Sequence, residues 1–136
     1  MRIDAHQHFW TYSPAAHPWI ERGGVLARDH VPADLMPLLD RAGFDGCIAV
    51  QAEQTEAETD ALLRLAADTP RILGVVGWTD LAAGDVADRL DQLRRRTALV
   101  GFRHMVQDEP ADDFLLTPAF VRGVRAALTR GFSYDI

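Results

Sequence analysis

The sequence predicts an α/β fold with a parallel sheet. Short apolar segments of strand length alternate with segments in which apolar residues recur at helical spacing, and Gly, Pro or capping residues separate the two kinds. This alternation is typical of parallel strands joined by right-handed helical crossovers. The chain has 136 residues, 48% hydrophobic and 25% charged, which is ordinary for one globular domain.

Five strands are expected, over residues 1–5, 46–51, 72–78, 99–103 and 132–136. The Val-rich third segment does not alternate apolar and polar residues, which suits a strand covered on both faces. A long loop, rich in aromatic residues, follows the first strand and extends to about residue 31.

A first helix is expected from Pro32 to Gly43, which is a typical C-terminal stop. The apolar residues Leu35, Leu38, Leu39 and Ala42 recur there at helical spacing. Pro37 lies inside this pattern and predicts an irregular or late-starting helix. The second helix opens on a capping box, in which Thr55 and Glu58 are expected to satisfy each other's backbone donors.

A third helix is expected after the cap Asp85, with an apolar face of Val86, Leu90 and Leu93. Thr117-Pro118 opens a fourth in the favoured order of cap and then proline, and Gly131 closes it. Its expected buried stripe is Phe120, Val121, Val124 and Leu128.

Two architectures fit this succession. An open doubly wound sheet needs phosphate-binding glycines after the first strand, but the turn there is H-Q-H-F-W. A (β/α)8 barrel normally needs about 250 residues, so this chain would be its first half plus one strand. The long aromatic loop suits the mouth of a barrel, and we therefore expect residues 1–136 to be the N-terminal portion of one TIM-barrel domain, with about five strands and four helices.

Composition excludes several classes of function. The net charge of −6 and pI near 5.2 argue against a nucleic-acid partner, and the basic run at 94–96 closes a predicted helix. No apolar run approaches the roughly 18 residues of a membrane span, and the N-terminus does not resemble a signal peptide. The single cysteine, Cys47, is expected to be a buried strand residue in a cytoplasmic protein. The chain has no lysine, so Schiff-base chemistry is unavailable.

The functional signal lies at the end of the first strand. Side chains alternate along a strand, so His6 and His8 point to the same side, at the carboxyl end where barrels carry their active sites. Two neutral imidazoles on one side can hold a divalent cation. By itself the H-x-H spacing is also compatible with a pair of pocket histidines or a chance spacing.

Several segments resemble one known family along almost the whole chain. They are I-D-A-H-Q-H-F-W at 3–10, P-W-I at 18–20, V-Q-A-E at 50–53, E-T-D at 58–60, G-F-R-H-M-V-Q-D-E-P at 101–110, D-F-L-L at 113–116 and F-S-Y-D-I at 132–136. Together they resemble the amidohydrolase-related TIM-barrel metal-dependent hydrolases, and within them the branch that contains sugar-acid lactonases. The resemblance implies a barrel about twice as long as this chain.

The resemblance implies a metal site at His6 and His8, with zinc as the leading candidate. The family takes a further histidine from a later strand and an aspartate from the last strand, and neither occurs in this chain. Asp135 lies on the wrong strand to replace that aspartate. Some relatives of this branch work without a metal, so a metal-free role of the histidine pair in substrate binding stays open.

The remaining site residues follow from the same resemblance. Arg103 and His104 match the catalytic end of the fourth strand, where a guanidinium can hold a carbonyl or carboxylate. Gln51, Glu53 and Trp10 are expected to contact the substrate. Gln107 is a weaker candidate, Trp19 is expected to pack the loop, and no role is assigned to His17 and His30.

The implied activity is hydrolysis of a sugar-acid lactone or similar cyclic ester by an activated water. The alternatives are a decarboxylase of the same superfamily acting on an aromatic or unsaturated acid, and a non-catalytic fragment or half-barrel. The expected partner is a small molecule, with no nucleic acid and no membrane, and the isolated chain is expected to be inactive and to self-associate through its unpaired strand edges.

Overall fold

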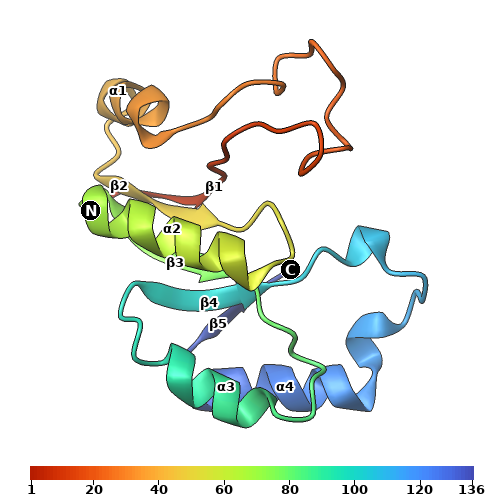
Figure 1. Cartoon of the computed structure of the whole chain (residues 1–136). Helices are drawn as coiled ribbons and strands as arrows, with labels where there is room; N and C mark the ends of the chain where they lie inside the picture. Colours follow the sequence, from red (N-terminus) through yellow and green to blue (C-terminus); the bar gives the residue numbers. More distant parts are fainter.

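A computed structural model describes residues 1–136, except for the side chain of Asp108 (Figure 1). It contains one parallel sheet of five strands: β1 (Ile3–Gln7), β2 (Gly46–Val50), β3 (Ile72–Gly77), β4 (Leu99–Arg103) and β5 (Ser133–Asp135). The helices are α1 (Pro32–Ala42), α2 (Glu56–Asp68), α3 (Val86–Leu93) and α4 (Pro118–Thr129), with short 3-10 turns η1 (Val106–Asp108) and η2 (Phe114–Leu116).

The strands lie in the sheet in chain order, β1-β2-β3-β4-β5. A doubly wound sheet reverses its strand order at a switch point, whereas a barrel adds each strand beside the previous one. The β1–β2, β2–β3 and β3–β4 pairs each contain one local irregularity in register. The chain therefore forms the N-terminal half of a TIM barrel, as predicted.

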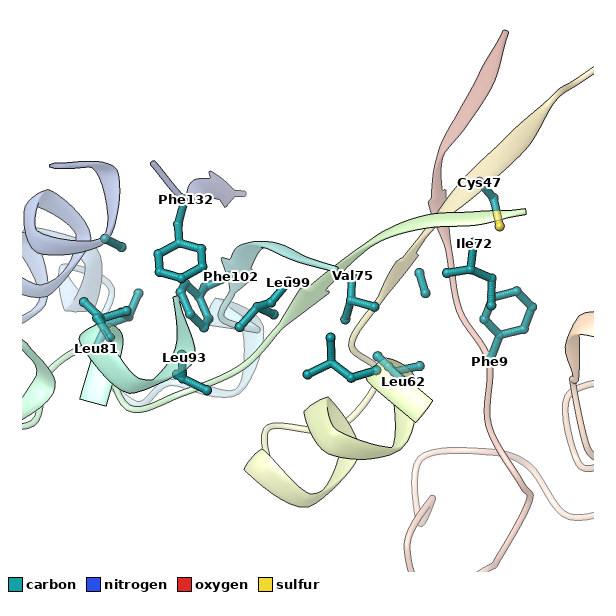
Figure 2. Close-up of a cluster of buried hydrophobic side chains, with 14 of the residues drawn as sticks. Phe9, Cys47, Leu62, Ile72, Val75, Leu81, Leu93, Leu99, Phe102 and Phe132 are labelled. Atoms are coloured by element: carbon teal, nitrogen blue, oxygen red, sulfur yellow. The ribbon is translucent and has the colours of Figure 1, made fainter. Parts of the chain in front are cut away.

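The core lies between the sheet and the helices, on what is the outer face of the half-barrel (Figure 2). Buried members from the strands include Cys47, Val75, Leu99 and Phe102, and Leu62 of α2 packs against them. Burial raises the pKa of the Cys47 thiol to about 11, so this side chain behaves as an apolar residue at neutral pH.

Most helix boundaries confirm the predictions, but α1 does not start late. It runs without interruption from Pro32 to Ala42 with Pro37 inside it, and ends on Gly43 in the left-handed conformation (φ 70°). Pro37 lies in the middle of the helix, and the helix continues although the proline removes one backbone donor. At its start, the backbone N–H of Val31 donates to the Asp34 carboxylate at 3.3 Å.

The capping box of α2 forms only in part. Thr55 Oγ1 accepts from the backbone N–H of Glu58 at 3.1 Å, as predicted. The Glu58 carboxylate, however, accepts from the N–H groups of Ala52 (2.8 Å) and Glu53 (2.7 Å) instead of that of Thr55. It therefore organises the turn that follows β2.

The buried stripe of α4 is rotated from the predicted one. Phe120, Gly123 and Ala127 are buried, whereas Leu128 is 52% exposed. A Cβ on Gly123 would lie 1.8 Å from the carbonyl oxygen of Leu81, so this glycine permits backbone contact between α4 and the β3–α3 loop. That close approach turns Leu128 outward. None of the described helices is long and apolar enough to cross a membrane.

Candidate active site

The candidate site lies where the strands end. His6 is on β1 and His8 directly follows that strand, Arg103 ends β4, and Asp135 ends β5. Arg103 and Asp135 are register partners, so their side chains emerge at the same level of the sheet. Parallel strands present their carboxyl ends at one edge, which brings these four residues together although they are far apart in the chain.

The two histidines point at one another, which confirms that they share one side of the strand. Their Nε2 atoms are 3.1 Å apart, and their rings meet edge to face with centroids 4.8 Å apart. The other nitrogen of each ring faces an acceptor: His8 Nδ1 lies 2.9 Å from the carbonyl oxygen of Val50, and His6 Nδ1 lies 3.3 Å from Asp135 Oδ2.

This arrangement fits two ligands of one metal ion. Two nitrogen ligands of a tetrahedral zinc ion lie about 3.3 Å apart. An Nδ1–H that donates to a carbonyl or carboxylate leaves the Nε2 lone pair free for a metal, and such supporting acceptors are typical of metal-binding histidines. Within the described part of the chain, no group of three or more His, Cys, Asp and Glu side chains forms a complete ligand set. The pair therefore has a spacing that two ligands of one metal ion would have, and the Asp135 carboxylate lies beside His6.

The environment of His8 favours its neutral form. Burial lowers the pKa of His8 against the hydrogen bond to Val50, and the positive charge of Arg103 acts in the same direction as burial. A neutral imidazole is the form that binds metals or accepts a proton.

A cavity of about 480 Å³ opens beside the pair. Its lining combines His8 and Arg103 with aromatic and apolar side chains, namely Trp10, Trp19, Leu26, Ala52, Met105 and Gln107. Trp10 and Gln107 thus lie where a substrate could reach them. Trp19 is 58% exposed and packs edge to face against Trp10 and His17 of the same loop, as predicted, and it also lines the cavity.

Gln51 is fully buried and does not line this cavity. Its Nε2 donates to the Arg103 carbonyl at 3.4 Å, and Arg103 Nη1 lies 3.4 Å from the Gln51 carbonyl. These two long hydrogen bonds join the ends of β2 and β4. Gln51 is therefore placed to hold Arg103 rather than to contact a substrate.

Glu53 does not share the space of the histidine pair, contrary to expectation. Its Oε1 lies 3.3 Å from Nε2 of His17, a residue with only 1% of its surface exposed. Glu53 lines a different cavity, between the β1–α1 loop and α2. The turn after β2 directs its side chain to the loop, and sequence pattern alone does not specify that direction.

His104 also lies apart from the pair. It follows Arg103 directly, and alternation sends its ring to the helix side of the sheet, stacked on Phe114 with centroids 4.6 Å apart. Its Nδ1 accepts from Trp78 Nε1 at 3.2 Å, and its Nε2 lies 2.6 Å from Glu109 Oε1. This position does not support contact with a substrate at the histidine pair.

Sequence reasoning missed three residues that the structure brings into or near the site. Asp135 supports His6, and His17 contacts Glu53. Glu58 lies beneath the turn after β2, and burial raises its pKa to about 7 although two backbone N–H groups favour its charged form. Glu58 carried a sequence signal in the capping box and Asp135 in the segment F-S-Y-D-I, but neither signal indicated the contact that the residue makes, and His17 carried none.

Comparison with known proteins agrees with this geometry. The amidohydrolase family pattern matches residues 3–136. The chain is 48% identical over its full length to an L-fucono-1,5-lactonase of Burkholderia multivorans, and it covers 46% of that protein. It is 36% identical to an L-fucono-1,5-lactonase of Burkholderia ambifaria, where the match covers 98% of this chain and 47% of the relative. The chain thus spans about half the length of these curated relatives.

Solved structures show the same relation. A crystal structure of an amidohydrolase from Burkholderia multivorans with bound zinc superposes with a TM-score of 0.93 and 46% identity, over 100% of this chain and 48% of that chain. With its half-barrel, its histidine pair and a family pattern that matches nearly every residue, this chain belongs to the amidohydrolase family.

Proposed function

We propose that the complete gene product hydrolyses the ring ester of a sugar-acid lactone, with His6, His8 and Arg103 in the reacting site. The observation that carries the proposal is that His8 and Arg103 line one strand-end cavity and that His6 Nε2 lies 3.1 Å from His8 Nε2. The L-fucono-1,5-lactonase names of the two Burkholderia relatives support a lactone over other substrates of amidohydrolases.

Lactone hydrolysis adds water to the carbonyl carbon, places negative charge on the carbonyl oxygen, and then breaks the ring C–O bond to give a hydroxy acid. Arg103 faces the cavity with a permanent charge and can donate to that oxygen as charge develops. Gln51 holds the end of β4 from beneath and limits the movement of Arg103.

His6 and His8 would hold a divalent metal, which when bound lowers the pKa of water and polarises a carbonyl. The chain's own contribution is to keep both Nε2 atoms directed to one point, through Val50 and Asp135. Because His8 is favoured as neutral, it needs no proton loss before it acts as a ligand or as a proton acceptor.

The apolar lining suits the carbon framework of a sugar. Trp10 and Trp19 stand edge to face with ring centroids 6.4 Å apart, and Leu26 and Met105 complete that wall. Aromatic faces bind C–H surfaces of sugars, while Gln107 can donate to or accept from hydroxyl groups. The lining therefore favours a small neutral lactone over a highly charged substrate.

The test is hydrolysis of L-fucono-1,5-lactone by the complete gene product, followed by proton release in a weakly buffered indicator solution. Lactone opening releases one proton without carbon dioxide, which separates it from decarboxylation. As a control, the variant Glu21→Ala, which changes an exposed residue of the β1–α1 loop, should hydrolyse the lactone at the rate of the wild type. Proton release at an enzyme-like rate supports the proposal. A wild-type rate equal to the spontaneous rate, at saturating zinc, would contradict it.

The 136-residue chain alone is proposed to be inactive and self-associating. In the described chain, β1 and β5 each pair on one side only, and Ile3, Leu73 and Val100 are 36–40% exposed. Unpaired edges and exposed apolar strand residues promote association. Sizing chromatography with a lactonase assay on the monomer fraction tests this, and an active, stable monomer would contradict it.

A further inference from the structure

The loop between β1 and α1, residues 8–31, is closed at its neck by main-chain hydrogen bonds. The N–H of Trp10 donates to the His30 carbonyl at 3.0 Å, and the N–H of His30 donates to the Trp10 carbonyl at 2.9 Å. The two rings also pack with centroids 4.3 Å apart. This loop supplies Trp10, Trp19 and Leu26 to the cavity, so its conformation determines the cavity's shape.

The centre of the loop is His17, a buried histidine that the sequence left without a role. Its ring centroid lies 6.2 Å from that of Trp10, 6.1 Å from that of Tyr12 and 6.2 Å from that of Trp19. Its Nδ1 lies 3.3 Å from the backbone nitrogen and 3.2 Å from the carbonyl oxygen of Ser13, so Ser13 can pair with either tautomer of the ring. A carboxylate beside Nε2 favours the tautomer that carries its proton on Nε2. His17 therefore organises the three aromatic residues of the loop.

Glu53 is the group that His17 Nε2 faces. The distance to Glu53 Oε1 is 3.3 Å, within the range of an ion pair, and Nε2 makes no hydrogen bond to any described residue. A buried polar nitrogen without a hydrogen bond costs free energy, and the nearby Glu53 carboxylate offsets part of that cost, which favours this position of the His17 ring.

Glu53 is itself held in a rigid turn. Its N–H and that of Ala52 donate to the Glu58 carboxylate, and Thr55 caps α2 two residues later. The backbone at Glu53 is thus held by α2, and its side-chain carboxylate meets a buried imidazole of the loop. The contact joins segments 36 positions apart in the chain (53 − 17).

We infer that His17 and Glu53 form a latch that fixes the β1–α1 loop, and that Glu53 is a positioning residue for Trp10 and Trp19 rather than a group that contacts the substrate. Glu53 lines a different cavity from His8 and Arg103, so its carboxylate reaches the site through His17. The inference deepens the proposed lactonase function, but the position of the loop can be measured without it.

Trypsin provides a readout that does not depend on catalysis. The chain has no lysine, and the loop carries two exposed arginines, Arg22 and Arg28, as cleavage sites. In the complete gene product, Glu53→Ala and His17→Ala should each speed cleavage at these sites by about tenfold, the order expected when one charge-assisted contact is lost. Glu21→Ala in the same loop is the matched control and should be cleaved like the wild type.

Kinetics with L-fucono-1,5-lactone then separate positioning from catalysis. Glu53→Ala and His17→Ala should raise KM by about tenfold with a smaller change in kcat, and the double variant should be no worse than either single one. Glu53→Gln keeps an acceptor for the neutral His17 ring, so it should restore both the wild-type KM and the wild-type cleavage rate.

Three results would overturn the latch: unchanged cleavage in both alanine variants, additive effects in the double variant, or a loss of kcat in Glu53→Gln as large as in Glu53→Ala. If Glu53→Ala fails to fold, His17→Ala supplies the cleavage test and Glu53→Gln is compared with the wild type, where a clear loss of kcat in Glu53→Gln would overturn the latch. If the wild type opens no lactone, the proposed function fails, while the cleavage rates still support or overturn the latch.

Discussion

Replacement of Arg103 by methionine should abolish most of the lactonase activity of the complete gene product. The guanidinium lines the cavity beside His8, and methionine keeps its approximate length without its charge or donors. Loss of one donor to a developing oxyanion costs about 10²–10³ in kcat, or about 2.7–4 kcal/mol. The effect on stability should be small, because the hydrogen bond from Arg103 Nη1 to the Gln51 carbonyl is long, at 3.4 Å.

The assay is kcat for L-fucono-1,5-lactone, with the unfolding midpoint measured in parallel. Arg103→Lys should recover part of the rate, because it keeps the charge but not the two-pronged geometry. His104→Gln is the matched control: its ring stacks on Phe114 on the helix side, so kcat should change far less. A folded Arg103→Met variant with the kcat of the wild type would refute the role of Arg103 as an oxyanion donor.

Three further predictions concern stability, each measured as the free energy of unfolding of the complete gene product. Gly123→Ala should destabilise by about 1–3 kcal/mol, because the new Cβ would meet the carbonyl oxygen of Leu81, and an unchanged midpoint would contradict that contact. Thr59→Val should cost about 1–3 kcal/mol, because Thr59 Oγ1 accepts from the Trp78 N–H (2.8 Å) and donates to the Trp78 carbonyl (3.0 Å); equal stability would show that water replaces the hydroxyl. The pKa of Glu58 is raised to about 7 in the folded protein, which therefore binds the Glu58 proton more tightly than the unfolded chain does. As the pH rises from about 4.5 to 7, the free energy of unfolding of the wild type should fall by up to about 3 kcal/mol relative to that of Glu58→Gln. A difference between the two proteins that does not change with pH would contradict this.

The sequence predicted the succession of elements because each carries local signals. The Thr117-Pro118 start of α4 and the β4 segment at 99–103 lie where they were expected, and the position of the histidine pair at the end of β1 follows from strand alternation. Arg103 reaches the cavity for the same reason: it ends a strand on the inner side.

What the sequence could not predict depends on contacts between distant segments. Glu53 was expected beside the histidines, but the turn after β2 directs it to His17, whose burial comes from the fold of a loop without regular structure. His104 was expected in the site because it follows Arg103, although the same alternation that places Arg103 in the cavity sends His104 to the helix side. Leu128 became exposed because the contact at Gly123 sets the rotation of α4.

The central claim is that His6 and His8 take part directly in lactone hydrolysis, at the carboxyl end of β1. The most direct measurement is kcat/KM for L-fucono-1,5-lactone, together with zinc content, in the folded double variant His6→Asn/His8→Asn of the complete gene product. The account predicts a fall in kcat/KM of about 10² or more, with loss of bound zinc and a preserved unfolding midpoint. An unchanged kcat/KM in the folded double variant would contradict it and make the pair a structural feature of β1.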